Sequence, residues 1–167
     1  EPLYACLTDD PTGTLKVNEF RDVKAPREVG RWAMDRPSVR EFTGPEGDRF
    51  TGGRYLHDVQ VKDGLLYAGY WRDGLVILDV GNGIKGGSPG SPKLVAQFKY
   101  DLDSLYRQVA ETDGPGFIRG THTAWRHKNY VFIADEVFGN DEAQKLFEGR
   151  PSRAHGRLQV VDVSDPA

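Results

Sequence analysis

The sequence predicts an all-β fold built from repeated four-stranded units, and two observations lead to that prediction. The first is a repeat of 65 residues, which separates His57 from His122 and places an aromatic strand residue, Tyr67 or Phe132, ten positions after each histidine. The second is composition, because 20 Gly and 10 Pro among 167 residues bound short runs rich in Val, Leu, Ile, Tyr and Phe. Four short strands at a fixed period, with no crossover helix, are typical of a β-propeller blade.

One unit is complete, and parts of two others flank it. Leu66, Val76, Leu78 and Val95 of the complete unit need apolar cover on both sides of a single sheet, which neighbouring units on each side provide. We therefore expect consecutive antiparallel strands in each unit. They are 3–7, 13–20 and 27–32 in the first, 57–61, 65–70, 75–80 and 93–98 in the second, and 122–126, 130–135 and 157–163 in the third.

These units divide the chain into about two and a half blades. Because propellers close with typically 4–8 blades, we expect a fragment of a larger propeller, or one chain that completes its ring with others. The apolar spacing after Asp101 and the Asp141–Gln144 pair predict a helix near 101–109 and another near 141–149. The predicted segments are 1–34 (the C-terminal part of a blade), 35–56 (a linker), 57–100 (a complete blade), 101–121 (a partly helical insertion) and 122–167 (a blade with an inserted loop at 136–155).

Composition excludes several classes of function. The chain has 22 Lys+Arg against 25 Asp+Glu, a formal net charge of −3, so it lacks the basic excess of a nucleic-acid-binding protein. No apolar run approaches the roughly 18 residues of a membrane span. The one cysteine, Cys6, cannot form an internal disulfide, and its alignment with Gly69 predicts a buried, inert thiol.

The start of the first strand in each unit marks the face where we expect a binding site, here called the entry face. In an antiparallel blade, this face also carries the insertions around 35–56, 101–121 and 136–155, and loops on a rigid scaffold often carry function. His57 and His122 begin successive first strands and so share it. The candidate binding residues are His57, Asp58, Trp71, His122, Thr123, Trp125, Asp135 and Glu136.

The paired histidines have two interpretations. In the first, they are metal ligands, with His155 or His127 as the third ligand. In the second, each histidine forms hydrogen bonds to its neighbouring blade. No closely spaced cluster of ligating residues and no catalytic motif is visible, so the sequence predicts no cofactor and leaves a transition metal as the alternative. Trp71 and Trp125 are expected either to stack on a ligand at the entry face or to pack one blade against the next. Asp79 and Asp162, with Glu19 at the equivalent place, end strands and are expected to cap turns.

Two stretches of the sequence resemble a known repeat. "HDVQVKDGLLYAGYWRDGLVILDV", followed by "PKLVAQF", resembles the LVIVD repeat of bacterial and archaeal β-propeller proteins, many of which are exported or lie at the cell surface. "GTHTAWRHKNYVFIADEVFG", followed by "GRLQVVDVSDP", resembles the next repeat. Over one blade, the chain is also similar to the selenium-binding protein and methanethiol oxidase propellers. The resemblance implies a propeller but no particular activity.

The leading functional hypothesis is a non-enzymatic binding or scaffold propeller. It is expected to be periplasmic, extracellular or at the cell surface, and to bind a protein or carbohydrate partner through the entry face. The remainder of the propeller, in the same or another chain, is a further expected partner, whereas nucleic acid is not. One alternative is a metal-dependent oxidase resembling the methanethiol oxidase propellers. Another is an accessory subunit of a large assembly.

Overall fold

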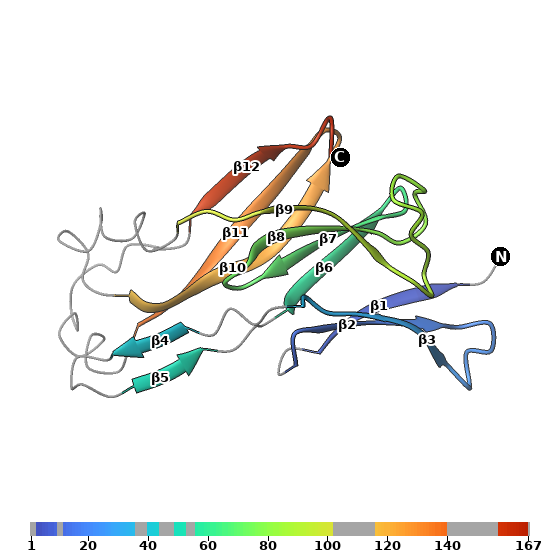
Figure 1. The fold of residues 1–167 in the computed structure, drawn as a ribbon, viewed down its shortest axis with the longest axis horizontal. Coiled ribbons are helices and arrows are strands. Elements are labelled where there is room, and N and C mark those ends of the chain that lie inside the picture. Colours follow the sequence, from blue (N-terminus) through green and yellow to red (C-terminus); the bar gives the residue numbers. More distant parts are fainter. Residues whose placement is uncertain are drawn as a thin grey trace.

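The structure is a computed structural model, and it confirms the predicted all-β fold class (Figure 1). In the described part of the chain, the regular elements are strands paired in antiparallel sheets. None of these residues belongs to a helix long and apolar enough to cross a membrane. The described residues are 3–9, 12–35, 40–43, 49–52, 56–101, 116–139 and 157–166.

The middle blade is one four-stranded antiparallel sheet with its strands in sequence order. Asp63 and Gly64, with φ of 52° and 72°, form the two-residue hairpin between its first two strands, a turn that requires positive φ at both positions. Every residue of its two central strands is buried. The four predicted strands are confirmed as β6 (Leu56–Lys62), β7 (Leu65–Tyr70), β8 (Gly74–Asp79) and β9 (Lys93–Phe98).

Three-stranded sheets flank the middle blade, and they also confirm the predicted strand order. Their strands are β1 (Tyr4–Asp9), β2 (Thr14–Glu19) and β3 (Arg27–Trp32) in the first sheet, and β10 (Gly116–His127), β11 (Tyr130–Gly139) and β12 (Leu158–Asp162) in the third.

Three segments assigned to loops or linkers contain strand. β10 begins inside the predicted 101–121 insertion, and β11 continues into the predicted 136–155 loop. A hairpin of β4 (Arg40–Thr43) and β5 (Arg49–Gly52) lies in the 35–56 linker. Sequence reasoning missed it because the linker carries no copy of the repeat, the signal that located the other strands. The two expected helices lie outside the described residues, apart from Asp101.

Strand pairing corrects the alignment of the first unit by two residues. Cys6 lies opposite Val17 in the first sheet, as Tyr67 lies opposite Ile77 in the middle blade. Cys6 thus corresponds to Tyr67 and not to Gly69. A shift of two keeps each side chain on the same face of its strand. Cys6 is half-buried, and burial raises the pKa of its thiol.

The three sheets stack as layers with a hydrophobic core on each side of the middle blade (Figure 1). This arrangement confirms that the middle sheet has apolar cover on both faces. Leu66, Val76 and Leu78 are buried toward the first sheet. Tyr67 and Ile77 are buried toward the third, with Val95 partly buried beside them.

The loops at the end opposite the entry face show the expected caps. The buried carboxylate of Asp79 accepts hydrogen bonds from five backbone N–H groups in the loop that follows β8. Asp162 accepts one, from Ser164. Glu19 instead pairs with two arginine side chains, so it does not cap a turn. The donors to Asp79 are Gly81, Asn82, Gly83, Lys85 and Gly87.

Candidate metal centre

Each of the two repeated histidines lies at an irregularity in the pairing of its strand. In β6, the pairing with β7 skips His57, which lies between Leu56 and Asp58. In β10, the pairing with β11 skips His122 in the same way, between Thr121 and Thr123. An extra residue of this kind is a β-bulge, a device that redirects one side chain and is common beside functional sites. The histidines therefore occupy matching positions, as the repeat predicts.

Close contact between the two blades brings the histidines together. Gly69 of β7 lies so near the backbone of β10 that a Cβ on it would come within 2.6 Å of the His122 carbonyl oxygen. The approach leaves the rings of His57 and His122 with centroids 3.8 Å apart and planes inclined by 36°. A glycine at this point thus permits the spacing of the histidines.

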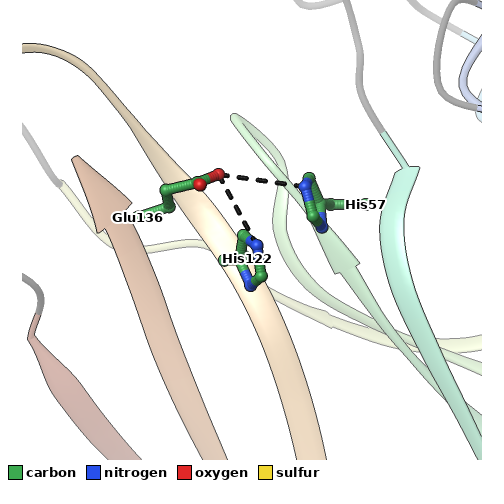
Figure 2. Close-up of side chains that lie close together, drawn as sticks. All are labelled: His57, His122 and Glu136. Carbon is green, nitrogen blue, oxygen red and sulfur yellow. Dashed lines mark ion pairs between the residues drawn. The ribbon is translucent and has the colours of Figure 1, made fainter. Parts of the chain in front are cut away.

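Glu136 of β11 completes the group, and Figure 2 shows its carboxylate reaching toward both rings. Its Oε2 lies 3.8 Å from Nε2 of His57 and 3.6 Å from Nε2 of His122. The three side chains are about one-third exposed, so the group is open to solvent on one side. They come from three strands of two blades, which the stacking of the sheets holds together.

The spacing of these ligand atoms fits a metal ion. One ligand atom from each residue lies within 4.8 Å of the others. Around a tetrahedral ion with bonds of about 2.0–2.1 Å, neighbouring ligand atoms are about 3.3 Å apart. The observed separations of 3.6 and 3.8 Å therefore close with side-chain movements of a few tenths of an ångström. Two imidazoles and a carboxylate are a donor set that suits zinc and related transition metals.

The second ring nitrogens differ in their surroundings. Nδ1 of His122 shares a hydrogen bond of 2.8 Å with the hydroxyl of Thr123, which orients the ring and directs Nε2 toward Glu136. Nδ1 of His57 is buried and has no hydrogen-bond partner within the described part of the chain. Thr123, an expected binding residue, thus acts on the site through His122.

A buried carboxylate lies directly behind Glu136 along β11. The hydroxyl of Tyr100 donates to Oδ1 of Asp135, and Thr121 forms a 2.8 Å hydrogen bond with the same hydroxyl. Burial raises the pKa of Asp135 to about 6, against the opposing effects of Tyr100 and Arg157. The sequence did not predict a role for Tyr100, because this residue lies between a strand and an insertion, where the repeat gives no alignment.

The remaining expected site residues lie elsewhere or have local roles. Asp58 accepts a hydrogen bond from its neighbour Val59. Trp71 is buried, and its ring occupies the space that a side chain on Gly120 would fill, so it packs one blade against the next. Trp125 projects from the outer face of the third sheet, about 10 Å along β10 from His122.

Two other histidines were candidates for a third ligand. His127 lies at the far end of β10, about 16 Å from His122 along the strand. His155 lies outside the described residues. Glu136, which the sequence predicted as an entry-face binding residue, is the third member of the group.

Comparison with known families identifies the middle blade. Residues 53–99, which include β6 to β9, match the family model of the LVIVD repeat. The chain carries an LVIVD repeat. Its strand pairing recurs in the third sheet, where the LVIVD blade's Leu65–Asp79 pair is matched by Tyr130 and Asp162. The chain is therefore a β-propeller-like repeat domain. No curated protein and no solved structure gave a significant match.

Proposed function

We propose that this chain is the metal-binding part of a β-propeller-like LVIVD-repeat protein, and that its entry face holds one divalent transition-metal ion. His57, His122 and Glu136 are the ligands. The observation that supports the proposal is the convergence of these three side chains from two blades. Oε2 of Glu136 lies 3.6 and 3.8 Å from Nε2 of the two histidines, and the three ligand atoms lie within 4.8 Å of one another. The bulges at both histidines add support, because the same distortion recurs where the ligands are presented.

The three-ligand set also defines what the ion can do. Structural zinc sites have four protein ligands, whereas catalytic and ligand-binding sites have three and leave a position for water or another molecule. About one-third of each ligand side chain is exposed, so an added molecule can reach the ion from solvent. The proposed ion therefore binds a small ligand or a polar group of a partner at the entry face.

Calorimetric titration of metal-free protein with zinc chloride at pH 7.5 tests the proposal. We expect saturable binding of one equivalent. His57→Ala, His122→Ala and Glu136→Gln should each weaken it at least tenfold, because each removes a ligand or its charge. His127→Ala is the matched control, since it removes a histidine from the far end of β10.

Two results would overturn the assignment. One is the absence of saturable zinc binding by folded protein, and the other is affinity that is equal in the three ligand variants and in wild type. Circular dichroism of each variant shows whether its fold is kept. This check separates a lost ligand from a lost structure.

A metal-dependent oxidase is the second candidate, and the open coordination position favours it. Its test is dioxygen consumption by copper-loaded protein with methanethiol, the substrate class suggested by the weaker family resemblance. Activity in wild type that is lost in His122→Ala would support the oxidase. Stoichiometric copper binding without dioxygen consumption would leave a binding function and remove this candidate.

A further inference from the structure

Two hydrogen bonds join the end of the LVIVD blade to the third sheet, and both involve the hydroxyl of Tyr100, which follows β9. This hydroxyl donates its one hydrogen to Oδ1 of Asp135. The 2.8 Å hydrogen bond with Thr121 must therefore run from the Thr121 hydroxyl to the Tyr100 oxygen. Thr121 and Asp135 are buried and lie opposite each other in β10 and β11. One side chain thus holds a pair of residues on the next sheet.

The pair held by Tyr100 comes immediately before two of the proposed ligands. Thr121 precedes His122 in β10, and Asp135 precedes Glu136 in β11. The pairing of the two strands is regular up to Thr121 and shifts at His122. Because a bulged residue is left unpaired, the sheet alone does not fix its position. The bonds from Tyr100 act on the residues next to the bulge.

The other proposed ligand, His57, belongs to the LVIVD blade. It lies in β6, in the same sheet as β9. The 3.8 Å between its ring centroid and that of His122, and the 3.8 Å from its Nε2 to Oε2 of Glu136, therefore depend on how the third sheet is placed against the LVIVD blade. A contact between the two sheets at this level controls whether the three ligand atoms come together.

Tyr100 differs from the neighbouring contacts between these two sheets. The backbone N–H of Thr121 donates to the carbonyl of Trp71 at 2.8 Å, and Gly69 lets the backbone of β10 approach β7. Both of these contacts act on β10. The hydroxyl of Tyr100 is bonded to a residue of β10 and to a residue of β11, so it places His122 and Glu136 together.

We propose that Tyr100 is a positioning residue of the metal centre, whose hydroxyl fixes His122 and Glu136 against His57. The inference rests on the proposed function, because it concerns the same ion. Removing a group that orients metal ligands from outside the coordination sphere typically weakens metal binding by about 10–100-fold. The ring of Tyr100 has a separate role, since it packs beside Phe98 with the ring centroids 5.7 Å apart.

Calorimetric titration of Tyr100→Phe with zinc chloride at pH 7.5 is the first test, because this variant keeps the ring and removes the hydroxyl. We expect zinc affinity to fall about tenfold. Tyr130→Phe is the matched control, since it removes a hydroxyl from the far end of β11. Phe98→Leu removes the neighbouring ring and keeps the hydroxyl. Both controls should bind zinc as wild type does. Equal affinity in Tyr100→Phe and Tyr130→Phe would overturn the proposal.

The second test measures the spacing of the histidines without metal. In metal-free wild type, the stacked rings of His57 and His122 should give a nuclear Overhauser cross-peak between their ring hydrogens. This cross-peak should weaken in Tyr100→Phe and persist in Tyr130→Phe. A variant that is merely less stable but still folded keeps it. An unchanged cross-peak in Tyr100→Phe would overturn this inference alone, whereas a wild type that shows the cross-peak but binds no zinc would overturn the proposed function.

Discussion

At one end of the stacked blades, the buried carboxylate of Asp79 accepts N–H groups from five residues of a single loop. At the other end, the buried carboxylate of Asp135 accepts the hydroxyl of Tyr100 on Oδ1, while its Oδ2 has no hydrogen-bond partner among the described residues. Burial opposes ionisation at both ends. The N–H groups nevertheless hold the pKa of Asp79 well below its ordinary value, whereas the pKa of Asp135 rises to about 6.

The difference separates a structural end from the end at which the metal site is proposed. Around Asp79, the loop supplies every donor that the carboxylate needs, so the arrangement stabilises the fold. Around Asp135 and Glu136, several polar groups lie close together and not all of them have hydrogen-bond partners among the described residues. Such an arrangement costs stability and is typical of binding sites. The two ends should therefore respond differently to substitution, to pH and to added metal.

The largest effect is expected at the structural end. Asp79→Asn replaces one carboxylate oxygen with an NH₂ group that faces backbone donors, so at least two hydrogen bonds to a charged group are lost. We expect a loss of about 4 kcal/mol in the free energy of unfolding at pH 7, measured with urea. Asp162→Asn, at the matching position of the third sheet, is the control because Asp162 is exposed and caps only Ser164. Equal losses in the two variants would contradict the comparison.

The second effect is a pH dependence of opposite sign at the two ends. The pKa of Asp135 is raised in the folded state, from 3.8 to about 6, so the folded protein binds this proton more tightly than the unfolded chain. Its contribution to stability is therefore present below pH 4 and is lost as the pH rises through 6, by about 2.5 kcal/mol. Asp135→Asn, measured in the presence of EDTA, should flatten the stability profile between pH 4 and 7.

Asp79 should act in the opposite direction. Its lowered pKa adds stability above pH 4 that is lost on further acidification. Asp79→Asn should therefore reduce the loss of stability below pH 4 and leave the slope between pH 4 and 7 unchanged. If the stability profiles of Asp135→Asn and Asp79→Asn both match the wild-type profile in these pH ranges, neither aspartate controls the pH dependence.

The repeat explains how much of this structure the sequence could predict. The period from His57 to His122 located the strands and placed both histidines at one end, because equivalent positions in stacked repeats lie side by side. It could not show that the two rings touch. That closeness depends on the bulges and on the approach of β10 to Gly69, and neither has a periodic signal.

The third proposed ligand could not be predicted for a related reason. Glu136 matches Trp71 of the LVIVD blade, where the chain turns after β7, but in the third unit β11 continues through Glu136. The extension points a carboxylate at the histidines, and only the paired strands reveal it. Trp125 was misplaced because its strand was correctly identified while the face on which it lies was not.

A third prediction concerns the contact that sets the histidine spacing. Gly69→Ala introduces a Cβ against the His122 carbonyl oxygen, so β10 must move away from β7. We expect a loss of about 2 kcal/mol in the free energy of unfolding together with weaker zinc binding. Gly90→Ala is the control, since its Cβ would meet the nearest backbone atom, the Val29 carbonyl oxygen, at an ordinary 3.4 Å. Unchanged zinc affinity in Gly69→Ala would show that this contact does not position His122.

The smallest effect is expected from Thr123, which orients His122 but is not one of the proposed ligands. Thr123→Val keeps the shape of the side chain in β10 but removes the hydroxyl that bonds to Nδ1. Zinc affinity should fall about tenfold, or about 1.4 kcal/mol, while the free energy of unfolding changes little because valine suits a strand. Thr8→Val in β1 is the matched control, and the readout is the dissociation constant from calorimetry. Thr123→Ser should restore affinity, because serine returns the hydroxyl. Failure of Thr123→Ser to bind more tightly than Thr123→Val would assign the loss to packing and remove the hydrogen bond from the account of the site.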